Sequence, residues 1–426
     1  MSIVNFPYGK ESLSYDFSGE RFNGCLLSNL HSYLPECDGE TLVRRAMAEP
    51  VGTKRLSELA RGKKNIVIIA SDHTRPVPSR VIIPPMLEEI RSVSPDASIT
   101  FLIATGCHRG TKREELVEKF GEDIVKNENI VIHDATDDEN LVNIGTLPSG
   151  GELYINKIAH EADLLIAEGF IETHFFAGFS GGRKSLLPGV AGRKTVLANH
   201  CSEFIAHDRA RTGLLDGNPI HEDMLWAAKR AKLAFIVNVV INEKKEAIYA
   251  VAGDVEAAHL KGCEFLSEQC AVAPIMADVV ISTNGGYPLD QNIYQAVKGM
   301  TAAEATVREG GVIIMIAKSN DGHGGEQFYR QLADEKDIDK TMSIFLARDR
   351  NETVPDQWQT QIFLRVLKRA TVIYVSDAPD DMVKDLHMIP AESIGDAIEK
   401  AKRILKNDTP TITAIPDGVA VMVVDK

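Results

Sequence analysis

The sequence lacks the cysteine and histidine spacings that build a conventional metal site. Its six cysteines form no C-x-x-C pair, and no H-E-x-x-H motif occurs in the 426 residues. These absences exclude a structural zinc site and a metalloprotease of the H-E-x-x-H type. We expect reduced, buried thiols at the six cysteine positions, which are 25, 37, 107, 201, 263 and 270.

Long hydrophobic runs are also absent. No stretch of about 18 apolar residues occurs, and the first ten residues lack the basic and apolar regions of a signal peptide. We therefore expect a cytoplasmic protein with no membrane-spanning segment. The 61 Asp and Glu residues outnumber the 47 Lys and Arg residues, so the formal charge is −14, which argues against general binding to nucleic acids or anionic membranes. Any anionic ligand must be held locally.

The sequence does contain a regular alternation of short apolar runs and stretches with helical spacing. Residues 65–70 (NIVIIA) predict a strand, and the apolar spacing over 78–93 predicts a helix after it. The same order recurs, with a helix over 111–120 and another through residue 158. Repeated β-α-β order predicts an α/β fold with mostly parallel sheets. Further strands are expected at 99–104, 130–134, 163–167, 234–242, 247–251, 278–282, 311–317 and 371–375.

The length is sufficient for at least two domains. Residues 270–276 resemble a connector, so we expect an N-terminal α/β domain over 1–272 and a smaller C-terminal α/β domain over 273–408. The active site is expected in the cleft between the two domains. The tail, 409–426, contains two more candidate strands and is expected to pack back on the first domain.

Polar segments follow three of the predicted strands, where ligands of parallel sheets usually bind. They are SDHTRP (71–76), TGCHRG (105–110) and the stretch from Glu168 through His174 to Lys184. Each alone is also explained as a helix cap or a turn. Three strand ends that all carry His or Arg favour a functional site.

The third segment includes GFSGGRKS (178–185), which is close to the phosphate-binding motif G-x-x-x-x-G-K-S/T. Arg183 stands where that motif requires its second glycine, and Pro188-Gly189 interrupts the helix that should follow, so the pattern disfavours an ATPase. No G-x-G-x-x-G follows the first strand, which disfavours an NAD-dependent dehydrogenase. Gly178 and Gly182 still permit close approach of a ligand, and Lys184 either reaches that ligand or is a surface cation.

Three of the 12 histidines lie in or soon after glycine-containing segments at predicted strand ends, namely His108, His174 and His200. An imidazole in such a place can act as base, acid or metal ligand. Because no second ligand stands at metal-binding spacing, a metal bound by one of them needs ligands from outside the protein. In the second domain, residues 292–299 predict a short helix, on which Gln295 and Lys298 share a face that is either solvated or directed at the site.

Taken together, SDHTRPVP (71–78), ATGCHRGT (104–111), EGFIETHFFAGFSGGRKSLLPG (168–189), Asn199-His200 and YQAVKG (294–299) resemble the nickel-dependent lactate racemase family. The likeness spans nearly the whole chain. No position that we carry over departs from the family's motifs.

The resemblance implies an enzyme with a nickel pincer nucleotide, a pyridinium mononucleotide that binds Ni(II) through two sulfurs and one ring carbon. It implies a covalent bond from Lys184 to this cofactor through a thioamide, and His200 as the nickel ligand. His108 and His174 match the acid/base pair. The other carried-over residues are Asp72, Gly178 and Gly182 for the cofactor, with Asp72 alternatively orienting Arg75, and Arg75, Tyr294, Gln295, Lys298 and Trp358 for the substrate.

The implied reaction is the interconversion of L- and D-lactate by hydride transfer from the substrate Cα, served by separate cofactor-synthesis and nickel-insertion enzymes. An alternative is a racemase or epimerase for another 2-hydroxy acid, such as malate or a longer chain. A non-catalytic nickel- or cofactor-binding maturation protein is a further alternative. The presence of both His108 and His174 argues against that last possibility.

Overall fold

The computed structural model describes residues 3–424, which form two compact units. One unit comprises residues 30–268. The other, here called the terminal unit, combines the residues up to Asn29 with those from Gln269 onward. This division differs from the expected boundary at residue 272, because strand β3 (Arg21–Cys25) pairs with β19 (Thr411–Ile415) and so belongs to the second sheet. Within residues 3–424, no helix is long and apolar enough to cross a membrane.

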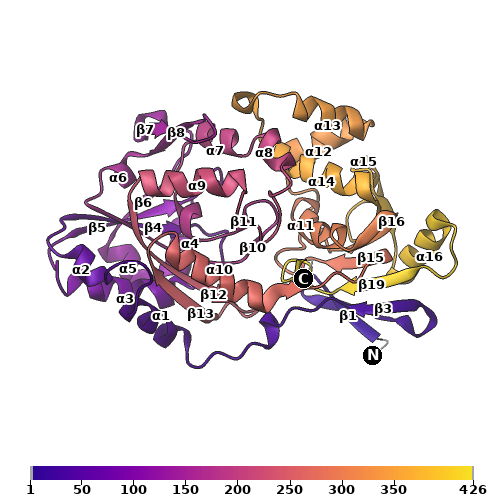
Figure 1. Ribbon diagram of the computed structural model, residues 1–426, viewed down its shortest axis with the longest axis horizontal. Helices are drawn as coiled ribbons and strands as arrows, with labels where there is room; N and C mark the ends of the chain where they lie inside the picture. Colours follow the sequence, from indigo (N-terminus) through magenta and orange to yellow (C-terminus); the bar gives the residue numbers. More distant parts are fainter. Residues whose placement is uncertain (1–2, 425–426) are drawn as a thin grey trace. The chain divides into compact units, whose positions relative to one another are not determined.

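The 30–268 unit is built on a six-stranded sheet (Figure 1). All neighbouring strands are parallel except the pair β12/β13, which is antiparallel. The predicted α/β class with mostly parallel strands is therefore confirmed. The order across the sheet is β13 (Ala247–Gly253), β12 (Leu233–Ile241), β9 (Leu164–Phe170), β4 (Asn65–Ser71), β5 (Ser98–Ala104) and β6 (Asn129–Ile132).

Helices cover this sheet because its strands are apolar on both faces. In β4, Ile66 and Ile68 pack in a core with helices α1 to α4, and the alternate residues Val67 and Ile69 are equally buried. Helix α9 and the short 3-10 helix η4 also contact the strands. The bounds are α1 (Gly39–Ala48), α2 (Leu56–Ala60), α3 (Ser79–Arg91), α4 (Arg113–Phe120), α5 (Glu122–Asn127), α7 (Arg193–Asn199), α8 (Ser202–Ala206), α9 (Pro219–Arg230), α10 (Ala257–Cys270) and η4 (Gly182–Ser185).

The prediction of a helix that runs through residue 158 is mostly wrong. The structure has an antiparallel hairpin of β7 (Leu141–Thr146) and β8 (Glu152–Asn156), and only the single turn α6 (Lys157–His160) is helical. The alternation of buried Leu153 and Ile155 has the period of a strand.

The terminal unit has its own six-stranded sheet, in which all neighbours are parallel. Its order is β18 (Ile389–Ala391), β17 (Thr371–Val375), β16 (Val307–Ile316), β15 (Ala277–Thr283), β19 and β3. The tail does not pack on the first domain as expected, because β19 inserts between β15 and β3, while β20 (Met422–Val423) pairs with β14 (Ala271–Val272). Other elements are β1 (Ile3–Tyr8), β2 (Glu11–Asp16), α11 (Ile293–Glu304), α12 (Glu326–Ala333), α13 (Ile338–Leu346), α14 (Gln357–Arg369), α15 (Asp380–Asp385) and α16 (Ile394–Leu405).

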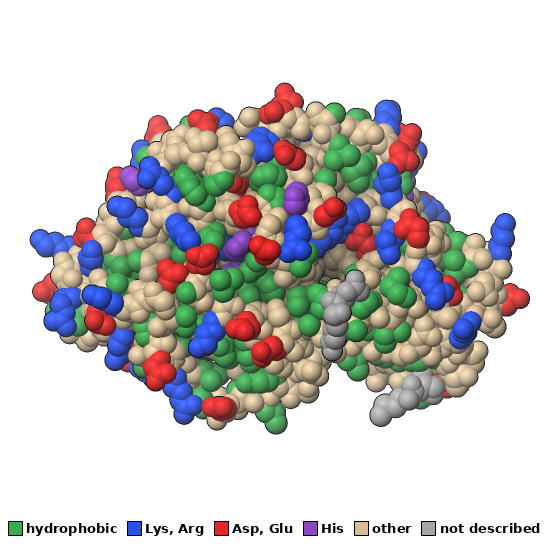
Figure 2. Space-filling model, in the orientation of Figure 1, with side chains coloured by type: hydrophobic (Ala, Val, Ile, Leu, Met, Phe, Trp, Pro, Cys, Tyr) green, Lys and Arg blue, Asp and Glu red, His purple; other side chains and the backbone are tan. Residues whose placement is uncertain are grey.

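Each sheet has a point where the direction of strand progression reverses. In the 30–268 unit the chain proceeds from β4 to β5 and β6 on one side, whereas β9 and β12 lie on the other side. In the terminal unit β15 has the corresponding place between β16 and β19. Ligands of open parallel sheets bind beyond the carboxyl ends of strands at such points. On the face shown in Figure 2, acidic and basic side chains are interspersed, as the composition suggests.

Candidate active site

The three polar segments singled out in the sequence follow neighbouring strands of one sheet. SDHTRP follows β4, TGCHRG follows β5, and the segment with His174 follows β9 on the other side of β4. Because these strands are parallel, their carboxyl ends meet at the same edge. The fold thus gathers the predicted residues of this unit at its reversal point.

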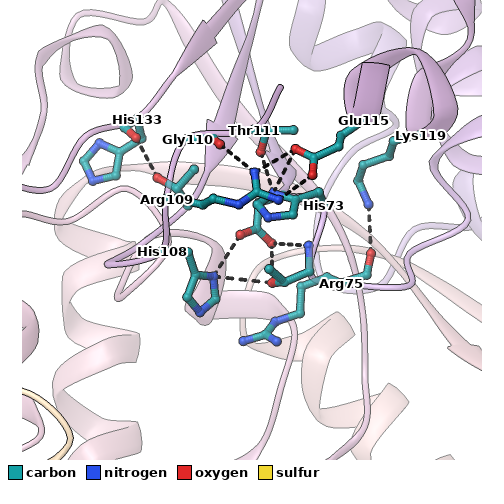
Figure 3. Close-up of polar contacts among 12 residues, drawn as sticks. His73, Arg75, His108, Arg109, Gly110, Thr111, Glu115, Lys119 and His133 are labelled. Carbon is teal, nitrogen blue, oxygen red and sulfur yellow. Dashed lines mark hydrogen bonds and ion pairs between the residues drawn. The ribbon is translucent and has the colours of Figure 1, made fainter. Parts of the chain in front are cut away.

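Asp72 and His108 form a hydrogen-bonded pair at this edge (Figure 3). The Nδ1–H of His108 donates to Asp72 Oδ2 at 2.8 Å, and Thr74 donates its amide and hydroxyl to Oδ1. Burial raises the pKa of Asp72, but the hydrogen bond from His108, the charges of His108 and Arg75 and the Thr74 hydroxyl outweigh it, so the pKa of Asp72 is lowered. Asp72 therefore stays ionised and fixes the His108 ring with Nε2 as its acceptor nitrogen.

Arg75 extends from the same loop with its guanidinium on the side of the cluster where His108 lies (Figure 3). Within residues 3–424 this guanidinium makes no hydrogen bond or ion pair, and the side chain is exposed. The Arg75 carbonyl accepts a hydrogen bond from Lys119 Nζ at 3.1 Å. The loop is therefore anchored through its backbone, while the guanidinium remains available for an anion such as a carboxylate.

Glu168, near the end of β9, supports this loop and was not assigned a role from the sequence. Its carboxylate is 1% exposed and accepts hydrogen bonds from the Ser71 amide and hydroxyl and from the Ser79 hydroxyl. Lys119 was likewise missed, because its link to Arg75 joins residues 44 positions apart. No local sequence signal distinguishes such a lysine from a surface one.

His174, Lys184 and His200 meet around the ring of Phe176. The His174 and His200 rings lie edge-on to Phe176, with centroids 4.4 Å and 5.3 Å away, and Lys184 Nζ lies 5.7 Å from the Phe176 centroid. His174 is on the short strand β10 (Thr173–His174), Lys184 is in η4, and His200 directly follows α7. Residues up to 26 positions apart are thus assembled on one aromatic side chain, which the sequence had not identified.

The hydrogen bonds of His174 and His108 define opposite tautomers. The amide of Ala177 donates to His174 Nδ1 at 3.3 Å, so in the neutral ring the proton is on Nε2. In His108 the proton is on Nδ1, where it is donated to Asp72, and Nε2 is bare. His174 is thus a proton donor at Nε2, whereas His108 is an acceptor at Nε2.

His200 is buried and held as a neutral ring. Burial, together with the positive charge of Lys184, lowers its pKa to about 3, although its hydrogen bond with Val196 acts in the other direction. Its Nδ1–H donates to the Val196 carbonyl at 3.0 Å, which leaves Nε2 as the atom with a lone pair. A neutral imidazole with one oriented lone pair is suited to bind a metal ion.

The two glycines predicted to approach the cofactor are explained in the structure by packing. Gly178 and Gly182 have φ values of 78° and 52°, and a Cβ would lie 2.4 Å from the Leu214 carbonyl oxygen or 2.7 Å from the His259 ring. The Gly182 amide already donates to Asn238 Oδ1 at 2.8 Å. Both positions require glycine because of neighbouring protein atoms, and their contact with a cofactor stays a prediction.

Several buried histidines of this unit, among them His200, His221 and His259, are held neutral. Burial and the charge of Arg183 lower the pKa of His221 to about 3 and that of His259 well below its usual value. Unfolding raises these pKa values to about 6.5, so below that pH the unfolded chain binds more protons and stability falls. From pH 7 to pH 5 each histidine should remove at most about 2 kcal/mol from the free energy of unfolding.

This loss can be measured by urea unfolding of the protein at pH 7 and pH 5. His221→Gln should show a smaller difference between the two pH values, whereas His207→Gln, at an exposed position, should leave it unchanged. Equal stability at both pH values would show that these rings are not held neutral.

The remaining predicted residues lie in the terminal unit, after the central strand β15. Helix α11 begins after Asn292, as predicted, and the Asn292 side chain accepts a hydrogen bond from the Gln295 amide at 3.0 Å. Carbonyl oxygens of the loop 319–325, which the sequence analysis had not identified, accept hydrogen bonds from the amides of Ile293 and Tyr294. The start of the helix is therefore capped by protein groups.

Gln295 and Lys298 are one turn apart on α11, as expected. The Oε1 atom of Gln295 is buried and has no hydrogen-bond partner among the described residues. Trp358 lies in the first turn of α14, and the adjacent Gln359 donates to the Tyr294 carbonyl at 2.5 Å. Tyr294, Gln295 and Lys298 are therefore on the first half of α11, and Trp358 is on α14, next to a residue that contacts Tyr294. The buried, unsatisfied Gln295 acceptor can take a hydrogen bond from a ligand.

Comparisons with known proteins show which family the chain belongs to. Residues 8–213 match the family model "Lactate racemase N-terminal domain", and residues 272–423 match "Lactate racemase C-terminal domain". The chain is 56% identical over 427 residues to a lactate racemase of Thermoanaerobacterium thermosaccharolyticum, with all of both chains covered. It is 54% identical over 424 residues to a lactate racemase of Lactiplantibacillus plantarum, covering 99% of this chain and all of that protein.

Solved structures show the same likeness. The lactate racemase apoprotein from Thermoanaerobacterium thermosaccharolyticum has a TM-score of 0.96 at 56% identity, covering 99% of this chain and all of that one. A Thermotoga maritima protein has a TM-score of 0.64 at 20% identity, covering 91% of this chain and 99% of that one, and shares the fold.

Proposed function

Because the chain belongs to the lactate racemase family, we propose that it is an isomerase that interconverts L- and D-lactate. The observation that carries this proposal is the His108–Asp72 pair beside the unpaired guanidinium of Arg75 at one strand edge. The imidazole can move a proton and the guanidinium can hold a carboxylate in a bidentate pair. A 2-hydroxy acid has both a hydroxyl proton for the imidazole and a carboxylate for the guanidinium.

The chemistry of the substrate favours removal of hydride over removal of a proton. The Cα hydrogen of lactate is very weakly acidic beside a carboxylate, whereas loss of hydride gives a neutral carbonyl. That route needs one group that accepts hydride and two groups that exchange the hydroxyl proton, one for each face. The side chains of proteins supply the second function but not the first, so a cofactor is required.

The residues around Phe176 fit a nickel pincer nucleotide. Among the described residues no group of three or more His, Cys, Asp or Glu could hold a metal ion, so a metal at His200 needs ligands from a cofactor. We propose that Lys184 holds this cofactor covalently and that His200 Nε2 binds its nickel. When bound, such a cofactor supplies the hydride acceptor.

The chain's own residues would then bind lactate and move its hydroxyl proton. His108, with bare Nε2, takes the hydroxyl proton of one enantiomer, and His174, with a proton on Nε2, supplies the proton for the other. Arg75 holds the carboxylate while the keto acid turns its other face. That Lys298, Gln295, Tyr294 and Trp358 of the terminal unit also bind the substrate stays a prediction.

Asp72→Asn should lower kcat about 100-fold or more, because the carboxylate that fixes the His108 tautomer and stabilises its protonated ring is lost. Nitrogen-15 NMR of histidine-labelled protein should show the Nδ1–H form for His108 and the Nε2–H form for His174 in the parent. Only the His108 signal should change in the variant. Asp134→Asn, at a carboxylate that caps a different loop, is the control. An unchanged kcat in Asp72→Asn would remove Asp72 from the mechanism.

The proposal as a whole is tested by intact mass and racemisation of the same preparations. Protein made without cofactor-synthesis and nickel-insertion enzymes should have the mass of its sequence and be inactive. Protein made with them should gain mass on Lys184 and racemise lactate, with malate as the comparison substrate. Full activity in a host that lacks those enzymes, without added nickel, would refute the cofactor assignment.

A further inference from the structure

Arg183 is a fully buried cation that the proposed reaction does not use. Its side chain is 0% exposed. One terminal nitrogen donates to the Phe179 carbonyl at 2.8 Å, and the other donates to the Ala177 carbonyl at 2.7 Å. The guanidinium therefore lies under the loop that joins His174 to Lys184.

No carboxylate pairs with Arg183 among the described residues. Its third close neighbour is His259 Nε2 at 2.9 Å, and its Nε atom has no hydrogen-bond partner. The groups around it are neutral at neutral pH, because burial lowers the pKa of His259 and His221 and raises that of Cys263 to about 12. Burial lowers the pKa of Arg183 itself only to about 10, so the guanidinium stays charged.

Carboxylates on neighbouring elements are engaged elsewhere. Glu168 of β9 is held by Ser71 and Ser79, and Asp223 of α9 accepts from the amide and hydroxyl of Ser149. The positive charge of Arg183 is therefore balanced only by dipoles. A buried charge without a counter-ion is unusual in proteins, because burial without a partner is costly.

We propose that the uncompensated charge of Arg183 helps to hold the anionic part of a nucleotide bound at Lys184, its chemical class being a phosphate monoester. This inference rests on the proposed function, which places a mononucleotide at Lys184. It explains how a chain with a formal charge of −14 binds an anion locally. The alternative is that Arg183 serves only to tie together the two loop carbonyls.

The two roles differ in what Arg183→Lys preserves. Lysine keeps the charge but cannot span both carbonyls as the guanidinium fork does. The experiment measures binding of nicotinic acid mononucleotide and of nicotinic acid riboside, which lacks the phosphate, to the cofactor-free protein by calorimetry. Arg183→Met should weaken mononucleotide binding about tenfold and riboside binding less than twofold, whereas Arg183→Lys should stay close to the parent. Lys194→Met, at an exposed cation, is the control for net charge.

A second pair of variants leaves Arg183 in place. The Cys263 Sγ atom lies 3.4 Å from His259 Nε2, and the charge of Arg183 lowers the pKa of its thiol, against the effect of burial. Cys263→Asp supplies the missing counter-ion and should cause the same phosphate-dependent loss, whereas Cys263→Asn should not. This pair decides the question if Arg183→Met does not fold.

Equal weakening of both ligands in Arg183→Met, or a loss in Arg183→Lys as large as in Arg183→Met, would show a purely structural role and overturn the inference. No difference between Cys263→Asp and Cys263→Asn, or no preference of the parent for the mononucleotide over the riboside, would overturn it as well. None of these outcomes changes the results expected in the mass and racemisation tests. A failure of this inference can therefore be distinguished from a failure of the proposed function.

Discussion

Lys184→Ala should abolish the added mass that cofactor-synthesis enzymes place on the protein, and with it all racemisation. The reason is that an amine at this position is needed for a covalent bond, which alanine cannot form. Lys184→Arg should fail in the same way, although it keeps the positive charge near Phe176. Intact-mass spectrometry of each variant, made with the same enzymes, measures the loss.

His200→Gln should give the opposite pattern, with the added mass retained and nickel lost. Glutamine is close in volume and has no imidazole lone pair, so the metal bond is removed with little change in packing. Nickel content per added mass should fall at least tenfold, and racemisation should fall with it. His207→Gln, at an exposed position close to α8, is the control. Equal loss of mass in the Lys184 and His200 variants would contradict the separate roles assigned to the two residues.

The strands that position this site could be predicted from sequence because they are short, apolar and buried on both faces. β4, β5 and β9 begin and end within a few residues of the expected bounds. The polar residues after these strands could be recognised for the same reason, because an apolar run ends where the chain leaves the buried sheet and reaches solvent or a ligand. The start of α11 was predicted within one residue, and the structure shows that the Asn292 side chain caps it.

What could not be predicted depends on contacts between distant residues. Nothing local indicates that β19 lies next to β3, because strand order depends on how whole sheets pack. The same limit applies within the site. The contact of Arg183 with His259 joins residues 76 positions apart, and Phe176, which contacts three of the predicted residues, resembles any core aromatic in the sequence.

The second large effect concerns the hydrogen on the substrate Cα. L-lactate that carries deuterium at C2 should give D-lactate that keeps its deuterium, because hydrogen that leaves and returns as hydride does not exchange with water. A proton held on His108 or His174 would exchange. Unlabelled lactate in deuterium oxide is the matched control and should give product without deuterium at C2, as measured by mass spectrometry of the isolated enantiomer.

The histidine variants extend this test to each face of the substrate. His108→Ala and His174→Ala should each block full racemisation, since the hydroxyl proton must be taken on one side and returned on the other. Each variant should still oxidise the one enantiomer whose partner histidine remains, and stoichiometric pyruvate should appear in a single turnover. The two variants should differ in which enantiomer reacts, because each histidine serves one face of the substrate. Solvent deuterium incorporated at C2 in every turnover of the parent would contradict hydride transfer and, with it, the need for a hydride-accepting cofactor at Lys184.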